Sequence, residues 1–446
     1  MSGFRSAATS TPNAGARTSG ALTWHRTPVV AVALAGAVVL AATGLALSRP
    51  DLVAVGIPLA LCFVWALRHR PEGGSLEVEL SAAPGTGEGV VTGNVDIEAA
   101  DADWVQLAVD QAGHRTGMAD VAPGEKALRS RSRLRHSGPI ELLAVTARGV
   151  ALDGAWASDA TPRASLRWSA VPALRRLREL PVAPRLTGLH GSHEGARPGQ
   201  GGDFRDIHPF APGDELRRVD WRATARLART PGELYVRRVN TLSDSSVVIA
   251  VDTADDLGEV VATWGSGDLE QSGTTSLDLA REAALSLATA AIETGDRVAF
   301  HELAPGGRTL RSGAGARYLA RLRDVISATG VSGDGSRFRR TPPIAQGSIV
   351  FVLSTFFDGA AAELATRWRA SGHAVVAVDV LPQPDDTRLS SEQRLATRTL
   401  LAERSDILLE LRRTGVEVLA WRDGDADAVL RMLLRGRHAR KPAVRR

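Results

Sequence analysis

Residues able to form ion pairs, hydrogen bonds or metal contacts are concentrated in one stretch of the sequence, residues 189–238. Acids and arginines alternate closely there, and Trp221 is the largest of the apolar side chains between them. Guanidiniums make planar two-point contacts with carboxylates. The pattern predicts an extended arm docked on a folded domain, with Trp221 in a pocket and ion pairs around it. Pro212, Gly213 and Asp214 mark a tight turn within the segment.

Three other functions compete for this segment. Its interspersed acids cancel the positive field that nucleic-acid binding requires, so we expect no nucleic-acid partner. His190 and His193 have a spacing found among metal ligands, but two histidines in a glycine-rich loop indicate a metal only weakly. Neither Ser192 nor Ser266 stands in the Gly-x-Ser-x-Gly turn of a hydrolase. The internal ion-pair network is therefore the favoured interpretation.

Further polar residues stand where predicted strands end. Asp252 closes the apolar run 247–252, and Ser354 with Thr355 follows the run 348–353. Such unalternated runs are interleaved with helical stretches throughout residues 246–436, which indicates a parallel sheet covered on both faces. In a doubly wound α/β domain of this kind, sites lie at the carboxyl ends of the strands.

The region before the dense segment differs in character. Short alternating segments with Gly/Pro/Asp punctuation run through residues 75–168, which predicts a small β-sandwich. Two apolar runs, residues 28–47 and 52–67, precede it and are long enough for a transmembrane hairpin. Residues 1–26 lack an apolar period and predict a disordered tail.

The arginines flanking the two apolar runs predict the orientation of the hairpin. Arg17 and Arg26 precede the first run, Arg68 and Arg70 follow the second, and Arg49 alone lies between them. The positive-inside rule then places both ends of the hairpin, and the soluble domains, in the cytoplasm. We expect a multi-pass protein of the cell membrane. A single cleaved signal peptide fits less well, because a second apolar run follows the first at once.

Composition excludes several classes of protein. The 446 residues carry a net charge of only +4 and one cysteine, Cys62, which rules out a disulfide scaffold and a cysteine-rich metal site. Lys126 and Lys441 are the only lysines, and neither stands in the Gly-Lys-Ser/Thr ending of a phosphate-binding P-loop. The sequence is therefore not that of a P-loop nucleotide hydrolase.

The dense segment, predicted to span residues 186–238, resembles the signature of the family called domain of unknown function 58. The similarity runs through Gly188, His190, Ser192, Gly199, Gly201, Phe204, Arg205, Phe210, Gly213, Asp214, Arg217, Asp220, Trp221, Ala223, Ala225 and Arg226. Asp203 stands where the family often has Glu, and His208 lies near its usual Arg. The resemblance implies a von Willebrand factor A-like α/β domain behind a membrane hairpin. We take Gly213, Asp214, Arg217, Asp220, Trp221, Arg222 and Arg226 as the signature residues available for interaction.

Von Willebrand A-like domains often hold Mg²⁺ with Asp-x-Ser-x-Ser after the first strand, and the resemblance directs attention to the same stretch here. Asp252 keeps the first acid, but Ala254 and Asp256 replace both serines. Thr355 stands where a later acid is expected, with Asp358 as a substitute, and Thr274 or Thr275 could supply the threonine. We expect a degenerate site without a metal or other cofactor, with Mg²⁺ binding as the alternative.

The function implied by the resemblance is that of a membrane-anchored scaffold, not an enzyme. Its cytoplasmic domain would bind protein partners, among them a MoxR-type AAA ATPase and other membrane or envelope proteins. An envelope-associated hydrolase and a metal-dependent adhesion module are the alternatives from other classes. All three rest on analogy between folds more than on a site in this sequence.

Overall fold

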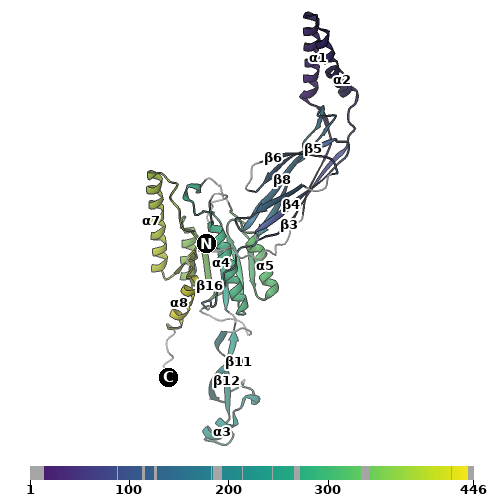
Figure 1. Ribbon diagram of the computed structural model, residues 1–446. Helices are drawn as coiled ribbons and strands as arrows, with labels where there is room; N and C mark the ends of the chain where they lie inside the picture. The colour runs from purple at the N-terminus through teal and green to yellow at the C-terminus, as the bar shows by residue number, and fades with distance from the viewer. Residues whose placement is uncertain are drawn as a thin grey trace. The chain divides into compact units, whose positions relative to one another are not determined.

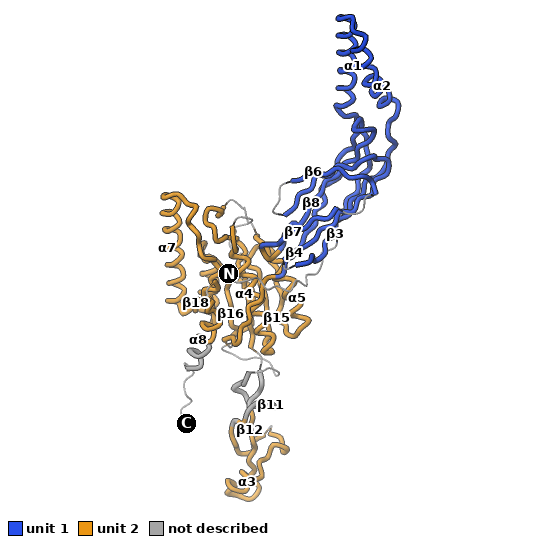
Figure 2. The backbone as a smooth tube through the Cα atoms, in the orientation of Figure 1, with its two compact units in different colours: residues 1–135, 139–171 blue, residues 136–138, 172–446 orange. Residues whose placement is uncertain are grey.

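The computed structural model of the chain describes residues 15–87, 89–112, 116–124, 128–181, 183, 193–212, 214–243, 245–265, 272–332, 341–422 and 424–439. Side chains are described in these ranges except at 193–203, 205, 240–243 and 434–439. The chain divides into two compact units (Figure 2). The first comprises residues 1–135 and 139–171, and the second comprises residues 136–138 and 172–446.

Two long apolar helices belong to the first unit, α1 (Pro28–Ala46) and α2 (Pro50–Arg68). Both are long and apolar enough to cross a membrane, and little of either helix is buried within the protein. Glycine lets them approach closely, since a Cβ at Gly44 would lie 2.7 Å from Cγ2 of Val53. The positions of the predicted apolar runs agree closely with these two helices.

The remainder of the first unit consists of two antiparallel sheets. Its strands are β1 (Ala16–Ala21), β2 (Trp24–Arg26), β3 (Ser75–Pro84), β4 (Val90–Ala99), β5 (Trp104–Gln111), β6 (Gly117–Val121), β7 (Leu128–Arg133), β8 (Gly138–Ala151), β9 (Trp156–Ser158) and β10 (Ala164–Ala170). One sheet has the order β1-β3-β4-β7, and the other has the order β2-β9-β8-β5-β6 with β10 also on β8. Alternate residues of both sheets share one core, in which Leu80 and Leu107 are fully buried.

The predicted disordered tail is wrong for its described part. Residues 16–21 form β1, which pairs with β3, and residues 24–26 form β2, which pairs with β9. Leu22 and Trp24 are buried, and the Trp24 indole N–H donates a 2.9 Å hydrogen bond to the carbonyl of Glu72. The composition of residues 16–26 gave no sign of this, because edge strands completed by a distant partner need little apolar periodicity of their own.

The second unit contains a six-stranded mixed sheet with helices (Figure 1). Its elements are β13 (Ser246–Asp252), a 3₁₀ turn η2 (Val261–Thr263), α4 (Ser276–Glu293), β14 (Arg297–Leu303), β15 (Thr309–Gly313), α5 (Ala316–Ser327), β16 (Ile349–Ser354), α6 (Ala360–Ala370), β17 (Ala374–Asp379), α7 (Ser391–Arg413), β18 (Glu417–Ala420) and α8 (Ala426–Ala439). The strand order is β15-β14-β13-β16-β17-β18, and all neighbours are parallel except β14 and β15.

Burial on both faces of this sheet explains its apolar strands. Every residue of β13, β16 and β17 is buried. Val248 and Ala250 pack in one cluster with Trp368 of α6, while the alternate residues Val247 and Ile249 point to the opposite face. The prediction of parallel strands interleaved with helices is confirmed for this region.

The dense charged segment forms a separate two-stranded arm. β11 (His193–Pro209) pairs antiparallel with β12 (Tyr235–Ser243), and the connection holds a 3₁₀ turn η1 (Leu216–Arg218) and the short helix α3 (Trp221–Leu227). The register of β11 shifts three times between Glu194 and Asp206, a stretch rich in glycine that also contains a proline. We refer to residues 193–243 as the arm.

Candidate functional site

The strand order of the second unit reverses between β13 and β16, and the carboxyl ends of these strands carry Asp252 and Ser354. The Ser354 hydroxyl donates a 2.7 Å hydrogen bond to Oδ2 of Asp252 and accepts one of 2.9 Å from the backbone N–H of Phe356. The other carboxylate oxygen of Asp252 accepts a 3.1 Å bond from the Ala254 N–H. The predicted position of Asp252 and Ser354 at strand ends is confirmed, and it is the usual place for a site in such a sheet.

The environment of Asp252 disfavours its charge. Burial raises the pKa of the Asp252 carboxyl from 3.8 to about 6, although the hydrogen bonds from Ser354 and Ala254 act in the opposite direction. The negative charges of Asp358 and Asp255 raise it further, and the pKa of Asp255 is itself raised by burial and by Asp358. Neighbouring acids therefore raise the pKa values of Asp252 and Asp255, and no cationic side chain of the described residues lowers that of Asp252.

The residues of the predicted degenerate metal site do not form a ligand set. Asp252 is engaged by Ser354, and Ala254 has no side chain that could bind a cation. Asp256 instead accepts a 3.0 Å hydrogen bond from the Leu277 N–H at the start of α4. No group of three or more His, Cys, Asp or Glu residues suited to a metal occurs among the described residues. The donor arrangement at Asp252 does not fit Mg²⁺.

Thr355 contributes its backbone instead of its side chain. The Arg404 guanidinium of α7 donates a 2.6 Å hydrogen bond to the Thr355 carbonyl and also binds the carboxylate of Asp379 at the end of β17. The side chains of Arg404 and Asp379 are nearly fully buried. Arg404 therefore neutralises the carboxylate at the end of β17, and we interpret this buried ion pair as a structural contact. Sequence reasoning did not identify Arg404 or Asp379.

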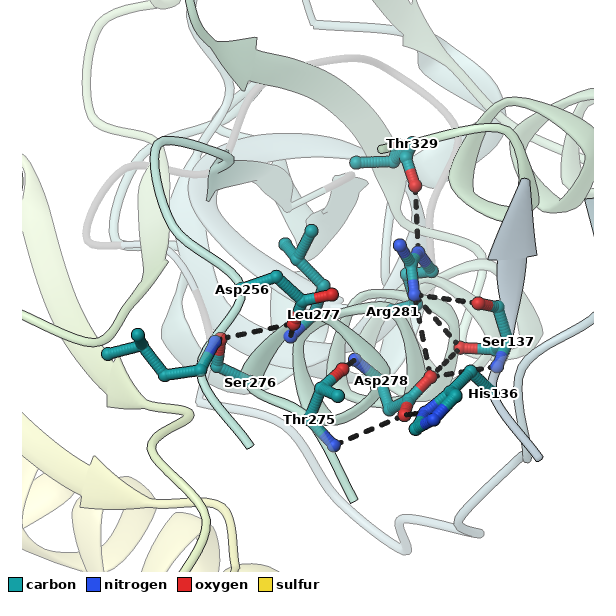
Figure 3. A network of polar contacts seen from close by, with 10 residues as sticks. His136, Ser137, Asp256, Thr275, Ser276, Leu277, Asp278, Arg281 and Thr329 are labelled. Carbon is teal, nitrogen blue, oxygen red and sulfur yellow. Dashed lines mark hydrogen bonds and ion pairs between the residues drawn. The ribbon is translucent and has the colours of Figure 1, made fainter. Parts of the chain in front are cut away.

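A second polar network, shown in Figure 3, surrounds the start of α4. Asp278 accepts hydrogen bonds of 2.8 Å from both the backbone N–H and the hydroxyl of Ser137, and its other oxygen lies 2.7 Å from Nδ1 of His136. Arg281 donates to the carbonyls of Ser137 and Thr329, at 2.9 and 2.8 Å. Residues 136–138 belong to the second unit although they follow β7 in the chain. The buried side chains of Asp278 and Arg281 therefore both have hydrogen-bonding partners within the network.

The sequence gave little indication of this network. Thr275 and Asp278 form a capping box, a pattern readable from Thr-Ser-Leu-Asp before a helix. Nothing in the local pattern of residues 136–138 shows that they contact α4. The sequence likewise did not show that position 138 requires glycine. Its backbone has a φ of 91°, and a Cβ there would lie 2.4 Å from Cζ of Arg281. Only the fold brings these positions together.

The signature residues of the arm hold its tip together locally. Asp220 caps α3 by accepting 3.0 Å hydrogen bonds from the Arg222 and Ala223 N–H groups. Asp214 closes its turn on the Ala211 N–H at 2.9 Å and pairs with Arg238 at 3.3 Å, which together lower its pKa. Arg217 pairs with its neighbour Glu215. Gly213 lies outside the described residues, as do Gly188, His190 and Ser192.

The expectation that Trp221 fills a pocket is wrong. Its side chain is 69% exposed, and Leu216 in η1 is exposed to the same extent. The acid at Asp220 that we expected to pair with an arginine is used as a helix cap instead. The arm is thus stabilised by short-range contacts within its own tip, and its largest apolar side chains are left for other contacts.

Several exposed arginines accompany these exposed apolar groups. No ion pair joins Arg222, Arg226 or Arg229 to a carboxylate of the described residues, and all three are exposed. Other exposed apolar side chains of the arm are Phe204, Ile207, Phe210 and Leu227. We call Leu216, Trp221, Arg222, Arg226 and Leu227 the tip surface. Mixed aromatic, aliphatic and arginine composition is typical of protein-binding surfaces.

Comparison with known proteins finds similarity to one family over part of the arm and most of the sheet of the second unit. Residues 206–396 match the family "Protein of unknown function DUF58". A 55-residue stretch is 49% identical to "Uncharacterized protein Rv1480" of Mycobacterium tuberculosis (strain ATCC 25618 / H37Rv) and to "Uncharacterized protein Mb1516" of Mycobacterium bovis. That stretch is 12% of this chain and 17% of either relative, so the chain matches about a sixth of their length. No solved structure matches the chain.

Proposed function

We propose that this protein is a membrane-anchored, non-enzymatic scaffold that binds a protein partner through the tip surface of its arm. The observation that supports this most directly is the exposure of Trp221 and Leu216 in a segment whose Arg222, Arg226 and Arg229 form no ion pair with an acid of the described residues. Exposed apolar groups gathered with arginines are typical of interaction sites, and tryptophan and arginine contribute most to binding energy at interfaces.

The remaining parts of the proposal are the anchor and the fold. The apolar helices α1 and α2 would form a membrane hairpin with the folded units in the cytoplasm. The strand order of the second unit, numbered in chain order, is 3-2-1-4-5-6, which supports a doubly wound, von Willebrand A-like domain. A MoxR-type AAA ATPase is the partner we propose, by analogy with the family that the arm resembles.

Binding to the tip surface is testable with the full-length chain in lipid nanodiscs. We would measure its binding to the MoxR-type ATPase of the same organism by biolayer interferometry. Trp221→Glu and Leu216→Glu should each weaken binding about tenfold or more, since a buried charge replaces an apolar contact. Leu395→Glu is the matched control, because Leu395 on α7 is 67% exposed and lies outside the arm.

A second measurement tests the role of the tip surface and the identity of the partner separately. A photo-crosslinking amino acid at Leu216 should capture the ATPase in native membranes, and one at Leu395 should not. Capture of a different protein from Leu216 alone would keep the tip surface and reject the ATPase. Equal capture from both positions, together with unchanged binding of the Trp221 and Leu216 variants, would contradict the scaffold proposal as a whole.

A further inference from the structure

Three arginines share one face of the edge strand β7 in the first unit. Arg129, Arg131 and Arg133 occupy alternate positions, and all three are exposed. Side chains two residues apart in a strand point to the same face, with their Cα atoms about 7 Å apart. β7 is at the edge of its sheet and pairs only with β4 among the described strands. This row of charge belongs to the first unit, whereas the arm and the strand ends described above belong to the second.

The neighbours of these arginines across the sheet are neutral. The register places Arg129 opposite Asn94, Arg131 opposite Thr92 and Arg133 opposite Val90. No carboxylate of the described residues pairs with any of the three. Elsewhere in the same unit an arginine does find an acid, as in the 3.1 Å pair of Arg17 with Glu77. Three guanidiniums in a row with no acidic partner among the described residues repel one another, and an anion between them would relieve that repulsion.

The acids of the same sheet lie toward its other end. Glu79 of β3 is opposite Asp96 of β4, and Glu77 is opposite Glu98. Asp96 is two residues beyond Asn94 along β4, in the direction away from Thr92. The four acids therefore gather at one end of the face, where Arg17 pairs with Glu77, and the three arginines of β7 lie toward the other end. Mixed charge is what solubility alone requires of a surface.

An open surface pocket of about 470 Å³, which we call the cavity, lies at the basic end of this face. It is lined by Pro84, Gly85, Thr86, Thr92, Arg129 and Arg131, none of which is acidic. The two guanidiniums and two hydroxyls offer more hydrogen-bond donors than one carboxylate can accept. Gly85 keeps the loop against the sheet, because a Cβ there would lie 2.8 Å from Cγ1 of Val90 and 3.2 Å from Oγ1 of Thr92.

We propose that this cavity binds a ligand carrying two or more adjacent phosphate groups. Guanidiniums match the oxygens of phosphate in two-point contacts, and each terminal phosphate brings several acceptor oxygens and more than one negative charge. The hydroxyls of Thr86 and Thr92, which also line the cavity, complete the donor set. Arg133, on the same face but not in the lining, adds to the positive potential without direct contact.

The position of the cavity along β3 favours a soluble ligand over a lipid headgroup. The strand begins at Ser75, close behind the end of α2 at Arg68, and the cavity begins at its last residue, Pro84. Nine steps along an extended strand cover about 30 Å. A headgroup at the end of α2 would therefore lie far along the sheet from Arg129 and Arg131.

The test is calorimetric titration of sodium tripolyphosphate into the full-length chain in phosphatidylcholine nanodiscs. Arg129→Gln and Arg131→Gln should each weaken binding about tenfold or more, as expected for loss of a charge-assisted hydrogen bond. Arg167→Gln on β10 makes the same change of charge at an exposed position of the same unit and should leave the affinity within about twofold. Melting temperatures of the three variants show that each is folded.

Two comparisons decide the ligand class and its source. Citrate carries several carboxylates but no phosphate, and it should bind at least about tenfold more weakly than tripolyphosphate. Adding phosphatidylinositol bisphosphate to the discs should not change the tripolyphosphate affinity. Absence of tripolyphosphate binding, or equal losses in the Arg129, Arg131 and Arg167 variants, would overturn the site. Equal binding of citrate would overturn the phosphate class, and competition by the lipid would overturn the soluble source.

Discussion

The raised pKa of Asp252 has a direct consequence for stability. With a pKa of about 6 in the folded chain against 3.8 when unperturbed, the folded chain binds a proton more tightly than the unfolded one. This favourable contribution is complete below pH 3.8 and is lost as the pH rises through 6, at a cost approaching 3 kcal/mol. Asp252→Asn should therefore raise the free energy of unfolding by about 2 kcal/mol near neutral pH.

The pH dependence of that gain provides the control. Urea unfolding of the full-length chain in detergent should show the gain at neutral pH and almost none near pH 4, where Asp252 is protonated anyway. Asp358→Asn should give a smaller gain in the same direction, because the Asp358 charge is only one of the causes of the raised pKa. A gain that is the same at both pH values would show that Asp252 stays ionised in the folded chain.

Magnesium should leave the melting temperature of the full-length chain unchanged. Asp252 is engaged by Ser354, Ala254 has no ligand atom, and Asp256 is bonded to the start of α4. A cation that binds only the folded state must stabilise it, so differential scanning calorimetry with and without millimolar MgCl₂ is decisive. A rise of several degrees in the wild type that is absent in Asp252→Asn would make Asp252 a ligand.

Asp278 behaves in the opposite sense to Asp252. Burial alone would raise its pKa, but the hydrogen bond and charge of His136 and the charge of Arg281 outweigh it and lower the pKa. Its stabilising contribution is thus present above its unperturbed pKa of 3.8 and is lost as the pH falls through the lower folded value. Asp278→Ala should cost about 3–5 kcal/mol at neutral pH, because it leaves the buried Arg281 without its carboxylate.

Asp324 on α5 is the matched control for this change. Its side chain is 54% exposed and lies 3.9 Å from Arg323, so Asp324→Ala should change the free energy of unfolding by less than about 0.5 kcal/mol. Urea denaturation at neutral pH measures both variants. Similar small losses for Asp278→Ala and Asp324→Ala would mean that the network around α4 contributes little to the fold.

Single residues were predictable where a local pattern determines their position. Asp252 and Ser354 follow apolar strands, so the sequence places them at strand ends, and the structure does as well. The sequence could not show that Asp256 would bond to the Leu277 N–H, since that contact depends on how α4 returns to the sheet. It likewise gave no sign that Asp278 would meet Ser137, 141 residues away.

At the scale of elements, the arm differs from the docked segment that the sequence predicted. A docked arm would bury Trp221, and truncating it would then cost about 3–5 kcal/mol. Since the side chain is 69% exposed, Trp221→Ala should change the free energy of unfolding by less than about 0.5 kcal/mol. Asp220→Ala should cost about 1 kcal/mol locally, because it removes the cap of α3.

Hydrogen exchange followed by mass spectrometry checks both effects. Asp220→Ala should speed exchange in peptides that contain α3 and leave β13 and β16 unchanged. Trp221→Ala should alter neither region in the isolated protein. A large loss of global stability on removing the Trp221 indole would show that the arm packs on the sheet after all.

Elements were predictable where burial is two-sided and regular. β13, β16 and β17 are almost entirely apolar because both faces are covered, and the helices between them lie within the predicted α/β region 246–436. The strands β11 and β12 were not predicted, because β11 is rich in charge and glycine and the two strands pair with each other. Strand propensity depends on partners that a single sequence does not identify.

At the scale of the whole molecule, the first unit joins residues on either side of the helix pair. β1 and β2 precede α1, yet they pair with β3 and β9, which follow α2. Both ends of the helix pair must therefore emerge on the same side of any membrane that it crosses. It also follows that a fragment beginning after α2 would lack one strand from each sheet, so the full-length chain is the sample to study.

The distribution of arginines around α1 and α2 predicts which side of the membrane holds the outer ends of the two helices. Arg26, Arg68 and Arg70 flank the outer ends of the helices, whereas Arg49 in the turn is paired with Asp51 at 3.1 Å. The excess of arginine at the outer ends predicts that these ends lie in the cytoplasm. A green fluorescent protein fused before Met1 or after Arg446 should fluoresce, and alkaline phosphatase at either position should be inactive. Phosphatase activity at both positions would reverse the orientation and leave the hairpin intact. Activity at only one of them would contradict the hairpin itself, and with it the sheet pairing of β1 and β2, because strands on opposite sides of a membrane cannot share a sheet.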